Sequence, residues 1–416
     1  MRESDGPAKD AAEAVARRSY GKLVAFLAAR TRDVAGAEDA LSDAFTAALS
    51  DWPAHGAPAN PEAWLMKVAR RKQIDAARRR QSGESASDAL RQSVEELAAA
   101  AESAGAIPDD RLRLMFACAH PAIEPQIRAP LILQTILGFD ASTIASAFLV
   151  APATMSQRLV RAKHKIKQAG IPFRVPERDE LSARLEAVLD SIYAAFAEGW
   201  SDPAGSETRR RDLAAEAIYL GRLVASLLPE EPEALGLLAL MLHAEARRGA
   251  RRDAAGDYVP LAQQDPAQWD QSAIDDAEQL LVAASHMNAI GRYQLEAAVQ
   301  SAHVARRVTG RTDWEAIERL YDALAALTDS PVIAINRAVA RAETQGAAAG
   351  MAALDQIAGD PRLAEYQPYW AARAGLLARL GQAEAAEAAY RLAIGLETDP
   401  AVRRFLQRQS ATLTPR

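Results

Sequence analysis

The sequence predicts an all-α protein with more than one domain. Nearly half of the 416 residues are hydrophobic, with abundant alanine and leucine, and aromatic residues make up only 6%. Segments in which Val, Ile or Thr alternate with polar residues, as in a half-buried strand, are almost absent. A chain of this length usually divides its core among two or three domains. We therefore expect two small helical modules followed by a larger helical domain.

Changes in composition mark the domain boundaries. A stretch rich in Ser, Ala, Glu and Gly separates two better-patterned segments, and two prolines in 170–180 follow a basic helix. The predicted parts are a first module at 1–80, a linker at 81–105, a second module at 106–175 and a C-terminal domain at 176–416.

The charges are distributed unevenly. The net charge is −6, but residues 1–176 carry 24 Lys and Arg against 20 Asp and Glu, whereas residues 177–416 carry 25 against 35. The first part is therefore at +4 and the second at −10, so we expect them to face different partners.

The single cysteine, Cys118, excludes an intramolecular disulfide and a zinc site built from several cysteines of one chain. The longest apolar run, 234–242, is far shorter than the roughly 20 residues of a membrane span, and no early segment resembles a signal peptide. We expect a soluble, cytoplasmic protein without a cofactor or a membrane partner.

Residues 138–170 predict two helices separated by a tight break. Helical spacing runs from Ala141 to Phe148, and Pro152 follows the break at a position where proline suits the first turn of a helix. This is the outline of a helix-turn-helix. In the second helix four apolar residues recur on one side and predict its buried stripe: Met155, Leu159, Ala162 and Ile166.

The other sides of this helix are basic. Residues 151–176 contain six Lys or Arg and no carboxylate, whereas an ordinary solvated helix mixes charges of both signs. Thr154, Ser156 and Gln157 come first, where a recognition helix contacts base edges, and Arg158, Arg161 and Lys163 come later, where phosphates run. The alternative is a surface helix whose cations are merely solvated.

Two further helices precede the linker. Residues 60–80 hold seven cations against Glu62 and Asp75, and Trp64 lies among them, a combination that suits single-stranded or distorted nucleic acid. Taken alone, Trp64 is better explained as a core anchor. Residues 36–52 form an acidic helix with an apolar side, and a solvated face is again the simpler explanation.

Taken together, these segments resemble the extracytoplasmic-function group of bacterial RNA polymerase sigma factors. The resemblance rests on AEDALSDAF, PEAWLMKVARRKQIDAARRR and the helix-turn-helix with the segment before it, in the family's order, and covers most of residues 10–176. It implies partners: core RNA polymerase, through its β′ and β subunits, and promoter DNA. The first module would bind β′ and the opened minus-10 element, and the second would read the minus-35 element.

The resemblance assigns roles by position. The core-binding helix would use Asp39, Asp43 and Phe45; the minus-10 helix Trp64, Lys67, Arg70, Arg71, Lys72, Arg78 and Arg79; and the minus-35 reader Thr154, Ser156, Gln157, Arg158, Arg161 and Lys163. Two positions depart from the family pattern. Ser42-Asp43 stands where Gln-Glu is common, and Arg71 stands where Asn is common. The resemblance therefore does not fix the details of the polymerase contact or the choice of minus-10 bases.

The C-terminal part predicts helical repeats. Six residues from Trp370 to Ala393 match a tetratricopeptide helix pair: Trp370, Ala374, Gly381, Ala386, Tyr390 and Ala393. Gly310, Gly346 and Gly381 are spaced 36 and 35 residues apart, close to the 34-residue period. Residues 216–270 predict a helix hairpin and a loop, and the whole resembles the sigma-factor subgroup with a tetratricopeptide-like extension. Five loop residues could form a ligand or docking site, although a satisfied surface loop is the simpler explanation: Arg251, Arg252, Asp253, Asp257 and Gln264.

No catalytic motif occurs, so we do not expect an enzyme. Two functions remain. The first is a sigma factor whose C-terminal domain regulates it by contacting a partner protein or the chain's own DNA-binding modules. The second is a stand-alone helix-turn-helix regulator or repeat scaffold, which would have no need of a core-binding helix.

Overall fold

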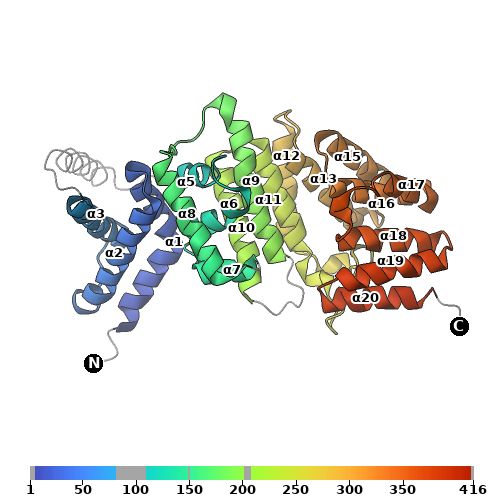
Figure 1. The fold of residues 1–416 in the computed structure, drawn as a ribbon, viewed down its shortest axis with the longest axis horizontal. Coiled ribbons are helices and arrows are strands. Elements are labelled where there is room, and N and C mark those ends of the chain that lie inside the picture. Colours follow the sequence, from blue (N-terminus) through green and yellow to red (C-terminus); the bar gives the residue numbers. More distant parts are fainter. Residues whose placement is uncertain (1–4, 81–108, 149, 201–207, 414–416) are drawn as a thin grey trace. The chain divides into compact units, whose positions relative to one another are not determined.

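The computed structural model confirms the all-α prediction (Figure 1). Across the described parts of the chain, the only β-structure is an isolated bridge between Arg252 and Tyr258. The predicted linker lies outside the described residues, which are 5–80, 109–148, 150–200 and 208–413.

The chain forms two compact units, Met1–Glu198 and Gly199–Arg416. The cut expected at residue 175 lies one helix before this boundary, and both predicted modules fall in the first unit. The helices of the first unit are α1 (Asp5–Thr31), α2 (Val34–His55), α3 (Pro61–Arg80), α5 (Arg111–Cys118), α6 (Pro125–Leu137), α7 (Ala141–Ala147), α8 (Pro152–Gln168) and α9 (Arg178–Trp200), whose last two residues belong to the second unit.

Local signals in the sequence set where these helices begin. Asp33 caps α2, because its Oδ1 accepts a hydrogen bond from the Gly36 amide at 3.0 Å. Asp140 accepts from the hydroxyls of Ser142 and Thr143 and from their amides, the amide bonds both at 2.9 Å. The hydroxyl bonds first, and then the amide bonds, hold its pKa well below the usual range. Pro152 opens α8 as predicted, and the four predicted stripe residues are buried.

Inside the first unit, the two modules pack against each other. α1 lies against α5 and α6, and α2 lies against α8. The closest approach is at Gly21, where an added Cβ would lie 2.0 Å from the Ile136 carbonyl oxygen. Glycine is therefore required at this crossing, because any side chain would push the modules apart.

The second unit is an array of helices, most of them joined by short turns, with a longer loop between α11 and α12. Its α-helices are α10 (Thr208–Leu227), α11 (Pro232–Ala246), α12 (Gln271–Ser285), α13 (Arg292–Val304), α14 (Arg306–Thr309), α15 (Trp314–Leu327), α16 (Pro331–Gln345), α17 (Ala347–Gln356), α18 (Gln367–Arg379), α19 (Ala383–Leu396) and α20 (Pro400–Ala411). Four single turns of 3₁₀-helix complete it: η1 (Arg248–Arg251), η2 (Leu261–Gln263), η3 (Pro266–Gln268) and η4 (Pro361–Leu363).

The three periodic glycines all lie in the breaks between helices. Gly310 precedes α15, Gly346 joins α16 to α17, and Gly381 joins α18 to α19; each has a positive φ, of 73°, 93° and 73°. Three successive helix pairs result: α13 with α15, α16 with α17, and α18 with α19. Glycine adopts a positive φ without strain, which explains why the period is visible in the sequence.

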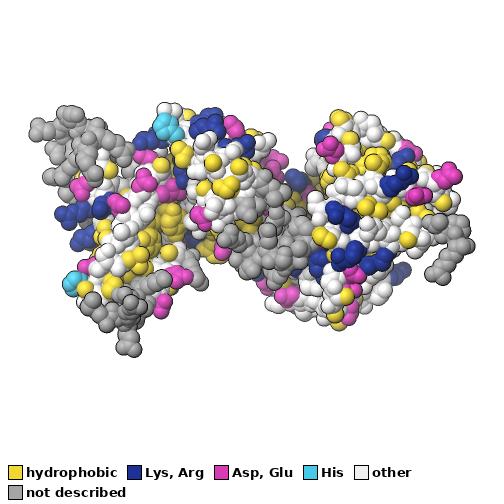
Figure 2. All heavy atoms as spheres, turned by 60° about the horizontal axis from the view of Figure 1, so that its bottom comes forward, with side chains coloured by type: hydrophobic (Ala, Val, Ile, Leu, Met, Phe, Trp, Pro, Cys, Tyr) yellow, Lys and Arg dark blue, Asp and Glu magenta, His cyan; other side chains and the backbone are white. Residues whose placement is uncertain are grey.

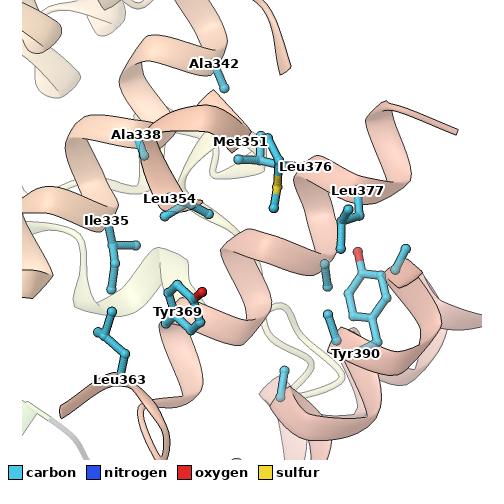
Figure 3. Close-up of a cluster of buried hydrophobic side chains, with 14 of the residues drawn as sticks. Ile335, Ala338, Ala342, Met351, Leu354, Leu363, Tyr369, Leu376, Leu377 and Tyr390 are labelled. Atoms are coloured by element: carbon cyan, nitrogen blue, oxygen red, sulfur yellow. The ribbon is translucent and has the colours of Figure 1, made fainter. Parts of the chain in front are cut away.

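A continuous core joins the last two helix pairs (Figure 3). Leu354, Tyr369 and Tyr390 fill it, and alanines such as Ala374 and Ala386 let the helices approach. Helix α11 is buried on nearly all sides, because it packs against α10, α12 and α13. Its contact with α10 agrees with the predicted helix hairpin. None of the helices in the described ranges has both the length and the apolar character needed to cross a membrane.

Candidate functional site

The acidic helix α2 presents a mixed surface. Asp39 and Asp43 are exposed, whereas Leu41, Ala44 and Ala48 are buried, as the apolar side of the helix predicts. Phe45, which the resemblance assigns to polymerase binding, is half-buried. Leu49, one turn further, is 50% exposed. Its exposure gives no signal in the sequence, since a leucine on an amphipathic helix usually faces the core.

Helix α3 lies beside α2 and is linked to it by charge. Lys72 Nζ lies 3.6 Å from Asp43 Oδ2, and Lys67, Arg71 and Lys72 are exposed. In Figure 2, Lys and Arg side chains gather on the part of the first unit where Figure 1 places α3. An exposed cationic helix next to an acidic one can bind two partners of opposite charge at once.

Aromatic contacts hold the N-terminal half of α3 against the neighbouring helices. Trp64 packs edge-to-face on the buried Trp52, with ring centroids 5.5 Å apart, and Arg70 stacks over Phe26 at 5.0 Å. Trp64 is only half-buried, so it anchors α3 and keeps part of its ring accessible. The backbone of Arg78 and Arg79 is helical, but their side chains lie outside the described residues.

Helix α8 presents its predicted polar residues to solvent. Ser156, Gln157, Arg158 and Arg161 are exposed, and Thr154 is half-buried. Val160, which the sequence analysis did not identify, is 62% exposed on the same outward face. An exposed aliphatic side chain among polar ones suits contact with a thymine methyl group in a major groove.

Lys163, by contrast, points toward α2. Its ammonium group is ion-paired with Glu38, and both side chains are largely buried. Lys167 Nζ lies 2.5 Å from Asp33 Oδ2, so a second ion pair joins the same two helices. Burial raises the pKa of Glu38, and the charge of Lys163 opposes this effect. In this arrangement Lys163 holds the two modules together instead of facing outward with Arg161.

The loop after α11 is mostly fixed by ion pairs to the end of the chain. Asp257 pairs with Arg404 and Arg408 of α20, at 2.9 Å and 2.7 Å, and Arg252 pairs with Asp399 at 2.7 Å. Asp253 closes the turn by accepting from the Asp257 amide at 2.9 Å. These contacts agree with a structural role for the polar residues of the loop.

Other candidate chemistry is limited. Cys118 is fully buried, and burial raises its pKa to about 12, so the thiol is unreactive at neutral pH. Within the described ranges, no group of three or more His, Cys, Asp and Glu side chains is arranged to hold a metal ion.

Comparison with known proteins identifies two segments. Residues 15–83, which include α2 and α3, match sigma-70 region 2, and residues 184–285 match a family of unknown function (DUF6596). The chain is 40% identical over 380 residues to the uncharacterized protein R00370 of Rhizobium meliloti (strain 1021), covering 90% of this chain and 89% of that protein. No solved structure matches significantly.

The region 2 match, on the acidic and basic helices described above, supports a sigma factor of the sigma-70 family. The chain belongs to the same family as R00370, since the similarity extends over most of both proteins.

Proposed function

We propose that the protein is a bacterial sigma factor of the extracytoplasmic-function group, which directs core RNA polymerase to specific promoters. The observation that carries this proposal is the match of residues 15–83 to sigma-70 region 2, together with the exposed acidic face of α2 beside the cationic face of α3. In this proposal the chain acts by binding polymerase and DNA and catalyses no covalent step.

Each surface has a role in this proposal. The α2 surface of Asp39, Asp43, Phe45 and Leu49 binds the β′ subunit, since it combines carboxylates with exposed apolar groups. Helix α3 holds the opened minus-10 strand through Lys67, Arg70, Arg71 and Lys72, with Trp64 for stacking. Helix α8 reads the minus-35 element through Thr154, Ser156, Gln157, Arg158 and Arg161.

The packing of α8 on α2 has a consequence for this mechanism. The minus-35 and minus-10 elements lie about 25 base pairs apart, or roughly 85 Å along B-DNA at 3.4 Å per step. Helices joined through Lys163 and Glu38 cannot reach both elements, and α8 also covers part of α2. In the proposed function, the modules separate when polymerase binds, and Lys163 then becomes available to a DNA phosphate.

The C-terminal unit is proposed to be a tetratricopeptide-like regulatory domain in a cytoplasmic transcription factor. The three helix pairs, with a positive-φ glycine near each break, support the repeat assignment. The acidic excess of residues 177–416 makes direct DNA binding by this unit unfavourable, so its partner is a protein surface.

The test is co-elution of the purified chain with sigma-free core RNA polymerase at moderate salt. The Asp39→Arg/Asp43→Arg variant should lose co-elution, whereas a matched variant with reversals at exposed carboxylates elsewhere in the first unit, Glu124→Arg/Glu186→Arg, should retain it. If neither the wild type nor the control binds polymerase, the sigma-factor proposal is wrong and the stand-alone DNA-binding regulator becomes the better explanation.

A further inference from the structure

Three arginines meet where α11 ends beside α13 and α14. We call Arg247, Arg251 and Arg306 the arginine cluster. Arg247 is only 8% exposed. Burial, followed by the positive charges of Arg251 and Arg306, lowers its pKa to about 10. The guanidinium therefore remains charged at neutral pH, in a field that its neighbours make more positive.

The partners of this cluster are neutral. Arg247 donates to the His243 carbonyl at 3.2 Å and to the Gln300 side chain. Arg306 donates to the carbonyls of Ala262 and Gln264, at 2.9 Å and 2.7 Å.

Carboxylates pair instead with the neighbouring arginines, Arg248 with Glu245 at 2.8 Å and Arg252 with Asp399 at 2.7 Å. Among the residues that the structure describes, no carboxylate lies within ion-pair distance of a cluster arginine. The charge of Asp399 reaches Arg251, but the Asp399 carboxylate is paired with Arg252. A buried cation without a counter-charge is destabilising, so buried charges are normally paired.

Buried donors at the cluster also lack acceptors. They are Nη1 of Arg247, Nε of Arg306 and Nε1 of Trp269, whose ring lies 5.0 Å from the Arg306 guanidinium. Nearly all buried donors in folded proteins are bonded, so three in one junction require an explanation. Arg251 and Arg306 are partly exposed, whereas Arg247 is buried, so solvent reaches part of the cluster.

The nearby histidines add no negative charge. Burial, with the charge of Arg247, lowers the pKa of His243 to about 4, and burial with Arg247 and Arg306 does the same for His303. Both imidazoles are neutral at pH 7, and protonation would only increase the positive charge.

We propose that the arginine cluster is a binding site for a small tetrahedral oxyanion of the phosphate type, either inorganic phosphate or the phosphate group of a small metabolite. Guanidinium groups present several N–H donors in a fixed plane and suit phosphate oxygens better than ammonium groups do. A dianion would supply the missing counter-charge and acceptors, and would tie η1 to α14. This inference concerns the second unit alone and does not depend on the sigma-factor proposal.

The experiment uses the full chain and inorganic phosphate as the probe. Thermal unfolding is measured with increasing potassium phosphate at pH 7.5, against potassium chloride of equal ionic strength, and the affinity is then measured by isothermal titration calorimetry. A ligand that binds only the folded state should raise the melting temperature by about 5 °C at 100 times its dissociation constant.

Variants locate the site. Arg247→Met and Arg306→Gln should each weaken phosphate binding at least tenfold, whereas Arg404→Gln, on the half-exposed partner of Asp257, should leave it unchanged. Circular dichroism establishes whether each variant is folded. If Arg247→Met does not fold, the test rests on Arg306→Gln, because Arg306 is partly exposed. A sugar phosphate that binds more tightly than inorganic phosphate, with the same dependence on Arg306, would support the metabolite as the source.

Two results would overturn the proposal. The first is a phosphate effect no larger than that of chloride, which would mean that solvent alone satisfies the cluster. The second is a saturable phosphate effect that survives Arg306→Gln and every folded Arg247 variant, which would place the anion elsewhere on the chain.

Discussion

The side chains of Lys163 and Arg247 are both largely buried cations, but their surroundings differ. Lys163 meets the carboxylate of Glu38 across two packed modules, whereas Arg247 meets only neutral acceptors and two other arginines. A compensated cation stabilises a contact already made within the chain. An uncompensated one favours an external anion, so burial of a charge alone does not indicate which role it has.

The largest expected effect comes from reversing the charge of Lys163. Lys163→Glu places two carboxylates together in a mostly buried site and should destabilise the first unit by about 3–5 kcal/mol, measured by urea denaturation. The exchanged pair Glu38→Lys/Lys163→Glu should recover much of this loss, and Lys165→Glu, on the exposed side of α8, should change stability by less than about 0.5 kcal/mol. An equal loss in both single variants of α8 would show that the ion pair to Glu38 is unimportant.

The next effect is a pH dependence of the second unit. His243 and His303 have folded pKa values of about 4, below the unfolded value near 6.5, so the unfolded chain binds more protons between these pH values. The contribution of these neutral histidines to the free energy of unfolding is therefore complete above pH 6.5. It is lost as the pH falls toward 4, by up to about 3 kcal/mol per histidine.

Urea denaturation at pH 4.5, 5.5 and 7 measures this dependence. His243→Gln should flatten the pH profile, whereas substitution of the exposed His286 by Gln should leave it unchanged. A profile as steep in His243→Gln as in the wild type would mean that His243 is not the titrating group.

The smallest expected effect compares two glycines in helices. Gly21→Ala places a methyl group 2.0 Å from the Ile136 carbonyl oxygen and should cost about 1–3 kcal/mol, because the two modules must move apart. Gly375→Ala in α18 meets no atom within 4 Å and should stabilise the second unit by about 0.5–1 kcal/mol. Thermal unfolding of both variants measures the difference, and a neutral Gly21→Ala would show that the crossing of α1 and α6 is loose.

Much of the local structure was predictable from the sequence. The buried stripe of α8, its start at Pro152 and the turn glycines 310, 346 and 381 were all identified, because each depends on a short-range preference. The acidic face of α2 and the cationic face of α3 follow equally from helical spacing.

Other features required the tertiary structure. The exposure of Leu49 and Val160 could not be predicted, because helical spacing does not say which apolar residues the rest of the chain covers. The resemblance placed Lys163 with the DNA-facing cations, since nothing near it in sequence indicates a partner 125 residues away.

The sequence by itself determined the helices, their amphipathic faces and the uneven distribution of charge, because these depend on residues close together along the chain. Only the tertiary structure decided that Lys163 is paired with Glu38 while Arg247 is buried beside Arg251 and Arg306. The physical reason is that the free energy of a charge depends on its burial and on the charges within a few ångströms, and distant segments supply both.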